Sequence, residues 1–86
     1  MNISTSNVFT DPVLVQAEET FDISISGTFS ATVVVERSKD LAAWRVVETF
    51  TAPVEKSGRG GSAWYYRVGV PSGGYTSGTV VAELYA

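Results

Sequence analysis

Apolar and polar residues alternate at every second position along much of this chain. Phe21, Ile23 and Ile25 alternate with polar residues, and Gly27 follows them. Because successive side chains of a strand point to opposite faces, a two-residue period predicts a β-strand with one buried face. We therefore expect Phe21, Ile23 and Ile25 to lie in the core.

The same alternation predicts several strands, and the connections between them are short and rich in Gly, Pro, Ser and Asp. The expected strands cover residues 13–15, 20–26, 31–37, 44–50, 64–70 and 79–85. In the fourth of them, Trp44, Val46 and Phe50 are expected on one face. Pro53 ends that strand because proline cannot donate to an inner ladder, and residues 71–74 predict a hairpin turn.

These elements predict an all-β fold. About six to seven short strands, with no helical period between them, are typical of an antiparallel β-sandwich, either immunoglobulin-like or a small barrel. Residues 1–12 are mostly polar and end at Asp11-Pro12, so we expect an extended N-terminal arm before a single β-sandwich domain over residues 13–86. A domain of this size is marginally stable, and a partner or an oligomer would add stability.

The composition is that of a folded protein, with 44% hydrophobic and 12% aromatic residues. Cysteine is absent, so the sequence offers neither a disulfide nor a thiolate metal site. The first residues lack the basic start and apolar run of a signal peptide, and no stretch approaches the roughly 20 apolar residues of a membrane span. We expect a protein that is made in a cytoplasm and does not bind a membrane.

The charges are unevenly distributed along the chain, whose formal net charge is −3. Residues 1–36 contain five acidic residues and no basic one, whereas all six basic residues follow, among four acids. Such asymmetry can steer one copy of a protein against another or against a charged lattice, unless folding interleaves the two parts. An acidic chain with scattered basic residues is not expected to bind nucleic acid.

The sequence contains little material for catalysis. Histidine and cysteine, the commonest general base and the best nucleophile, are both absent. Glu18-Glu19 is the one adjacent carboxylate pair, and it falls in an expected turn where both groups are solvated. No Asp-x-Asp spacing supports a metal site. We expect neither an enzyme nor a cofactor.

One local pattern stands between two of the expected strands. Ser38 and Asp40 can accept hydrogen bonds from the amides of a tight turn, and Trp44 follows them. The stretch resembles the Asp-box hairpin of sialidases, although Ala42 stands where that motif has glycine and the chain has a single copy. We interpret it as a device that shapes a hairpin, with little weight for a carbohydrate role.

Two further regions are expected at the surface. Residues 56–62 are rich in glycine and basic residues and are expected to form an exposed loop. Tyr65, Tyr75 and Tyr85 are the aromatic residues expected to be exposed, and tyrosine is enriched where proteins bind proteins.

Part of the chain resembles small β-sandwich proteins encoded among the virion genes of tailed bacteriophages. The similarity covers about residues 13–85 and is carried by residues 21–27, 33–38, 44, 50–56 and 65–70. Proteins of that kind decorate or cement the outside of an icosahedral head, commonly as trimers near threefold positions, or serve as head-fibre or tail modules. The resemblance thus implies a virion protein on the outer capsid surface, made in the host cytoplasm.

The expected function is that of a capsid decoration (cement) protein, which binds the major capsid protein as a homo-oligomer, with a trimer favoured. The alternative is a head-fibre or tail-associated module that recognises a host-surface glycan. The arm is expected to become ordered on the capsid or on a neighbouring copy, by adding a strand to a sheet edge. The expected interface residues lie in the arm, in the basic loop and in the exposed tyrosine set: Asn7, Phe9, Asp11, Lys56, Arg59 and Tyr75.

Overall fold

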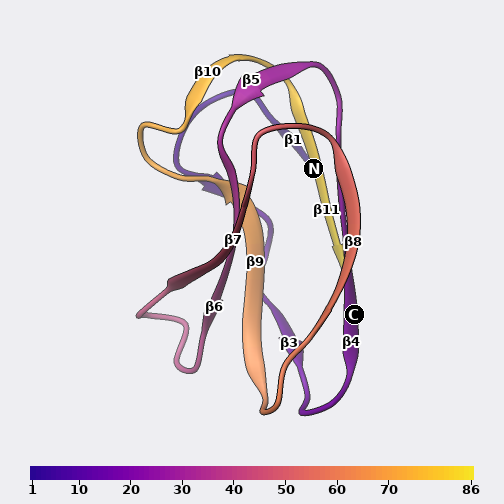
Figure 1. Cartoon of the computed structure of the whole chain (residues 1–86). Coiled ribbons are helices and arrows are strands. Elements are labelled where there is room, and N and C mark those ends of the chain that lie inside the picture. The colour runs from indigo at the N-terminus through magenta and orange to yellow at the C-terminus, as the bar shows by residue number, and fades with distance from the viewer.

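A computed structural model describes the whole chain, residues 1–86, as β-strands joined by turns and short loops (Figure 1). The strands are β1 (Asn2–Ile3), β2 (Val8–Phe9), β3 (Val13–Val15), β4 (Thr20–Ser26), β5 (Phe29–Ala31), β6 (Val33–Ser38), β7 (Arg45–Phe50), β8 (Val54–Arg59), β9 (Trp64–Val70), β10 (Tyr75–Gly78) and β11 (Val80–Tyr85). The predicted all-β fold is therefore confirmed. The chain has no helix that could cross a membrane.

The strands form three antiparallel sheets. The first has the order β1-β11-β4-β8, and the second has the order β2-β9-β6-β7, with β3 also paired to β9. A third sheet contains only β5 and β10. In Figure 1 the strands of the first sheet lie on the right, those of the second lie centrally and on the left, and β5 and β10 are at the top. We refer to the first two as the β4 sheet and the β9 sheet.

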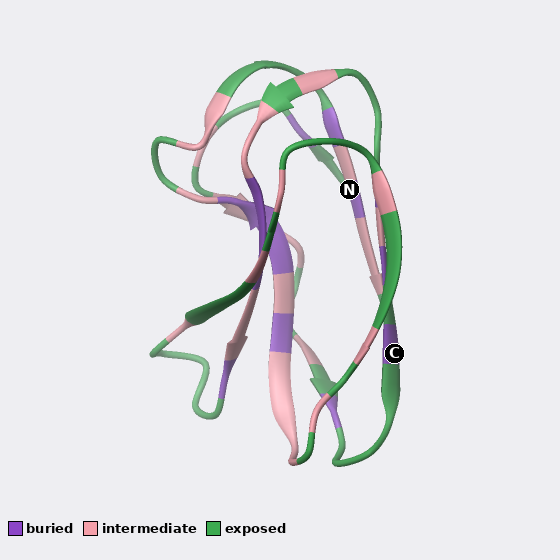
Figure 2. Cartoon of the chain, in the orientation of Figure 1, coloured by how far each residue is buried: buried purple, intermediate pink, exposed green.

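The core is built from the inward side chains of the β4 sheet and the β9 sheet. Its buried residues form one cluster: Ile3, Val15, Phe21, Ile23, Ile25, Val33, Val35, Tyr66, Val68, Val70, Val80 and Ala82. The rings of Phe21 and Tyr66 join the two sheets, with their centroids 4.2 Å apart. Figure 2 shows the buried bands on β9 beside the largely exposed β7 and β8. The predicted core positions Phe21, Ile23 and Ile25 are confirmed.

The extended N-terminal arm is not confirmed. β1 pairs with β11, and β2 pairs with β9, so the first residues join both large sheets. The side chain of Ile3 is only 1% exposed. Scattered apolar residues in a polar segment are enough for two very short strands because the neighbouring strands supply the hydrogen bonds. The boundary at residue 12 stays a prediction.

The expected loop over residues 56–62 is wrong in its first half. Lys56 and Arg59 lie in β8, which pairs with β4 at the edge of the β4 sheet. An edge strand tolerates polar side chains because one of its faces and its free edge meet solvent. Gly58 fits this position because a Cβ there would lie 2.5 Å from Cζ of Phe21.

Two predictions about registry and turns also differ from the structure. A bulge in the pairing of β6 with β7 places Val35 opposite Glu48 but Glu36 opposite Val46. Because the extra residue reverses the alternation, Val46 and Phe50 do not share a face as expected. The tight turn at residues 71–74 is confirmed by the hydrogen bond from Gly74 N to Pro71 O, 2.9 Å. The hairpin is wrong, because β10 pairs with β5 instead of β9.

Candidate functional site

The outer face of the β4 sheet carries polar side chains in two rows across three strands. Tyr85, Asp22 and Ser57 lie opposite one another on β11, β4 and β8, and Glu83, Ser24 and Glu55 form the next row. These six residues are named the polar face. Their side chains point outward because Phe21, Ile23 and Ile25, at the alternate positions of β4, are buried.

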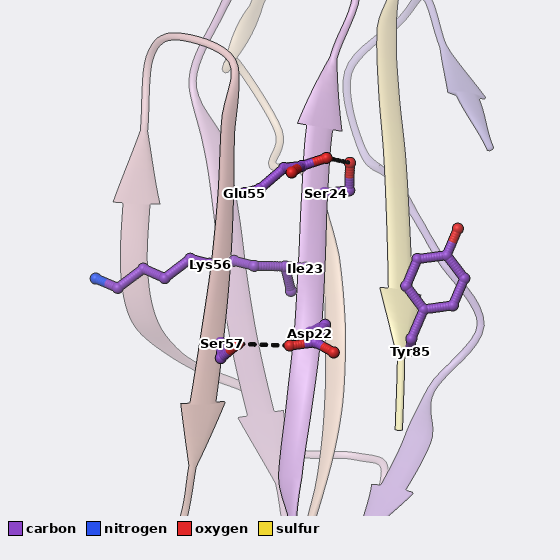
Figure 3. Close-up of a pocket in the computed structure, with 7 residues that line it drawn as sticks. All are labelled: Asp22, Ile23, Ser24, Glu55, Lys56, Ser57 and Tyr85. Atoms are coloured by element: carbon purple, nitrogen blue, oxygen red, sulfur yellow. Dashed lines mark hydrogen bonds between the residues drawn. The ribbon is translucent and has the colours of Figure 1, made fainter.

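An open hollow lies on this face, and Figure 3 shows the residues that line it. Ser57 Oγ donates to Asp22 Oδ1 at 2.5 Å, and Ser24 Oγ donates to Glu55 Oε1 at 3.4 Å. Neither Asp22 nor Glu55 takes part in an ion pair. The ring of Tyr85 stands beside the hollow and is 58% exposed. The face therefore presents two carboxylates without a cationic partner.

Two cations lie near the polar face, and each is already paired. Lys56 also lines the hollow, but its Nζ points away in Figure 3 and lies 2.8 Å from Glu48 Oε2 on β7. The amino group of Met1 lies 2.6 Å from Glu83 Oε1. Asp22 and Glu55 therefore keep their negative charges available to a partner.

A tight turn between β6 and β7 forms the second candidate surface. Ser38 Oγ accepts hydrogen bonds from the amides of Asp40 and Leu41, at 3.2 and 3.0 Å. Asp40 Oδ1 accepts from the amides of Ala42 and Ala43, at 2.9 and 3.0 Å. The amide of Ala43, then that of Ala42 and then the Ser38 hydroxyl hold the pKa of Asp40 below its ordinary value of 3.8. The predicted hairpin device is confirmed.

This turn carries three basic residues, Arg37, Lys39 and Arg45, which are named the cationic turn. Arg37 lies directly opposite Arg45 in the pairing of β6 with β7. The guanidinium carbon of Arg37 and the Nζ of Lys39 lie 4.2 and 4.1 Å from the centroid of the Trp64 ring. Lys39 Nζ also donates to Ala63 O at 2.6 Å. None of the three basic residues forms an ion pair, whereas Lys56, Arg59 and Arg67 do.

The outer face of the β9 sheet is closed by its own side chains. The guanidinium carbon of Arg67 lies 3.9 Å from the centroid of Phe9 and 4.2 Å from that of Trp44. Its Nε donates to Glu36 Oε1 at 2.8 Å. Beneath them Val34 is almost fully buried, although it lies outside the core cluster. Phe9, Glu36, Trp44 and Arg67 are named the aromatic stack.

A glycine allows the aromatic stack to form. Gly69 lies opposite Phe9 in the pairing of β2 with β9, and a Cβ there would lie 2.6 Å from Phe9 Cα. Any other residue would therefore displace β2 and the Phe9 ring above Arg67.

The interface residues expected from the sequence are distributed over several elements and do not form one cluster. Phe9 stacks on Arg67, Lys56 pairs with Glu48, and Arg59 Nε is 3.8 Å from Glu18 Oε2. Tyr75 lies in β10, Asp11 is exposed beside β2, and Asn7 occupies a turn with a φ of 60°. No hydrogen bond or ion pair joins any two of the six. Their part in an interface stays a prediction.

Asp22 and Glu55 were not among the expected interface residues, although both belong to the polar face. The polar positions of residues 20–26 do indicate an outward face. The sequence does not indicate, however, that Tyr85 and Ser57 lie on either side of Asp22. That arrangement depends on the pairing of β11, β4 and β8. No group of three or more acidic side chains is arranged to hold a metal ion.

No protein family model matches this chain, and no curated protein or solved structure is significantly similar to it.

Proposed function

We propose that this chain is a capsid decoration (cement) protein of a tailed bacteriophage, which binds the outside of the major capsid lattice through protein contacts. The observation that carries the proposal is the order of strands in the two large sheets. The resemblance of residues 13–85 to phage virion proteins points in the same direction.

The strand order favours a jelly roll over an immunoglobulin-like sandwich. We count β2 and β3 as one interrupted strand and leave aside the short sheet of β5 and β10. The β4 sheet then has the order first, eighth, third, sixth, and the β9 sheet has the order second, seventh, fourth, fifth. Two sheets that interleave in this way are typical of an eight-stranded jelly roll, a fold used by viral capsid domains and by lectins.

The sheet edges support binding through faces and turns instead of strand addition. The bulge at Val47 twists the free edge of β7. Lys56 of the edge strand β8 forms an ion pair with Glu48 of the edge strand β7. Charged side chains on edge strands disfavour pairing with a further strand. The residues that were expected to add a strand to a partner are themselves paired in β1 and β2. Contacts with a capsid would therefore use preformed surfaces, which lowers the entropic cost of binding.

The second candidate function is a glycan-binding module of head-fibre or tail type. It is favoured by Tyr85, which stands beside the hydroxyl and carboxylate groups of Asp22 and Ser57. An exposed aromatic ring next to hydrogen-bonding groups is suited to the apolar face and hydroxyls of a sugar, and lectins share the jelly roll.

Co-sedimentation with phage heads assembled without this chain tests the proposed function. We expect saturable pelleting at a fixed ratio to the major capsid protein, and heads that already carry the chain should take up no more of it. Failure of the purified chain to pellet with undecorated heads would overturn the proposal. Binding to a glycan array that Tyr85→Ala abolishes would then support the second candidate.

A further inference from the structure

All three basic residues that form no ion pair lie on one surface, and two of the five acidic residues that form none lie together on another. Four ion pairs use the amino terminus, Lys56, Arg59 and Arg67. The three remaining basic residues all belong to the cationic turn. Two carboxylates without a cationic partner, Asp22 and Glu55, lie on the polar face.

These two surfaces cannot neutralise each other within one copy. The polar face belongs to the β4 sheet, on the right in Figure 1, whereas the turn between β6 and β7 projects at the lower left. No ion pair connects them. Their opposite charges can therefore meet only between molecules.

We propose that the polar face of one copy binds the cationic turn of a second copy of this chain. The inference deepens the proposed function by naming the surfaces through which a decorating oligomer would form, and it rests on that function only for the place of the oligomer on a capsid. Because the two surfaces differ, the contact is heterologous. Repetition of a heterologous contact produces a closed ring, such as a trimer, or an open chain of copies.

The shapes of the two surfaces agree with this contact. The cationic turn projects from the body and ends in the exposed side chain of Leu41, whereas the polar face contains a hollow beside Tyr85. The hydrogen bonds of Ser38 and Asp40 hold the turn in one conformation before binding. A rigid turn loses little conformational entropy when it docks, which favours binding.

The unpaired charges of the two surfaces favour a second copy of this chain over other occupants of the hollow. Asp40 also lies in the cationic turn, but its carboxylate already accepts two backbone amides, so the basic residues dominate there. Arg45 is exposed and takes part in no hydrogen bond between side chains, which leaves its guanidinium able to bind a carboxylate. Glu55 on the polar face is exposed and free of cations in the same way. Charged pairs of this kind steer association and fix orientation.

Analytical ultracentrifugation of the purified chain at low ionic strength tests this inference. We expect wild-type protein to self-associate and to dissociate as salt is added. Arg45→Glu and Glu55→Arg should each weaken the association by about tenfold or more. An equimolar mixture of these two variants should associate again, because each supplies the surface that the other lacks. Asp11→Lys, which changes an exposed acid outside both surfaces, is the matched control and should associate like wild type.

Monomeric wild-type protein, or an equal loss of association in Asp11→Lys, would overturn the inference. The same variants in the head-binding experiment separate it from the proposed function. Self-association without binding to heads would refute capsid decoration and leave the contact between copies standing. Monomers that bind heads, and lose this binding in Arg45→Glu or Glu55→Arg, would assign the surfaces to the capsid instead. Monomers that bind a glycan through Tyr85 would assign the hollow to the sugar.

Discussion

The outer faces of the two large sheets both carry polar and aromatic side chains, but these side chains are paired differently on each face. On the β9 sheet, the rings of Phe9 and Trp44 both pack against the Arg67 guanidinium, and Glu36 accepts its hydrogen bond. On the β4 sheet, Asp22 and Glu55 accept hydrogen bonds only from serine hydroxyls, and Tyr85 stands in solvent. The polar groups of the first face are paired with one another, whereas the second face leaves two carboxylates without a cationic partner.

Two ion pairs of the molecule differ in exposure in a similar way. The side chains of Arg67 and Glu36 are 25% and 12% exposed, whereas those of Lys56 and Glu48, at the sheet edges, are 49% and 40% exposed. Desolvation makes a partly buried pair costly to break, while solvent and salt screen an exposed one. Aromatic and charged side chains thus cover the outer face of the β9 sheet, whereas the outer face of the β4 sheet remains open.

Removal of residues 2–10 would break this comparison most severely. It takes Phe9 from the aromatic stack and the buried Ile3 from the core, and it leaves β11 without one of its neighbours. We expect a loss of about 4 kcal/mol or more in the free energy of unfolding, close to the whole stability of a small domain. Circular dichroism of the truncated chain would then show no cooperative thermal transition.

Asn2→Ala in the full chain is the control for the truncation, because the Asn2 side chain is exposed and should matter little. A truncated chain that melts like wild type would mean that the first residues are an arm after all.

The regular strands of this fold could be predicted from the sequence because apolar residues recur at alternate positions along them. The bounds of β4 and β9 agree with the predicted residues 20–26 and 64–70. β8 could not be found in this way, because an edge strand with polar side chains has no such period. The bulge at Val47 was also hidden, since it depends on the pairing of two strands.

The candidate surfaces were less predictable than the strands. The turn chemistry of Ser38 and Asp40 is local in the sequence, so its hydrogen bonds could be foreseen. The polar face joins residues that are far apart along the chain, such as Asp22 and Tyr85. Likewise, the sequence could not reveal that Phe9 and Trp44 enclose Arg67. Contacts of this kind depend on which strands are neighbours in a sheet, and alternation within one strand does not encode that.

Arg67→Met sharpens the contrast between the two faces. Methionine keeps part of the apolar stem but leaves the carboxylate of Glu36, whose side chain is 12% exposed, without its partner. We expect the free energy of unfolding to fall by about 2–3 kcal/mol in urea titrations. Tyr85→Ala on the polar face should change it by less than about 0.5 kcal/mol.

The double variant Arg67→Met with Glu36→Gln should recover part of the loss, because the uncompensated charge is then removed as well. If Arg67→Met and Tyr85→Ala lowered the free energy of unfolding by equally small amounts, the contrast between the two faces would be contradicted.

Lys56→Met tests the exposed pair at the edges of β7 and β8. Because both partners are well exposed, we expect a loss of less than about 1 kcal/mol in the free energy of unfolding. The difference from wild type should shrink further in about 1 M salt, where exposed charges are screened within a few ångströms. A loss as large as that of Arg67→Met, or one that salt does not reduce, would contradict the distinction between the two pairs.

The smallest expected effect concerns Asp40, which shapes the turn between β6 and β7. Backbone amides hold its pKa in the folded state below its ordinary value of 3.8. The ionised carboxylate therefore stabilises the fold at pH values above that value, and this contribution is lost as the pH falls through the folded pKa. Asp40→Asn should melt slightly below wild type at neutral pH, and the two melting temperatures should converge in acid.

Thermal unfolding of both proteins across this pH range measures the effect, and Ser38→Ala is the companion variant. Ser38 contributes a hydroxyl that does not titrate, so a large part of its effect should persist in acid, where that of Asp40→Asn disappears. A gap between wild type and Asp40→Asn that stays constant down to strong acid would show that the side chain acts through its shape alone. The cationic turn would then owe its rigidity to Ser38 and to the strands on either side.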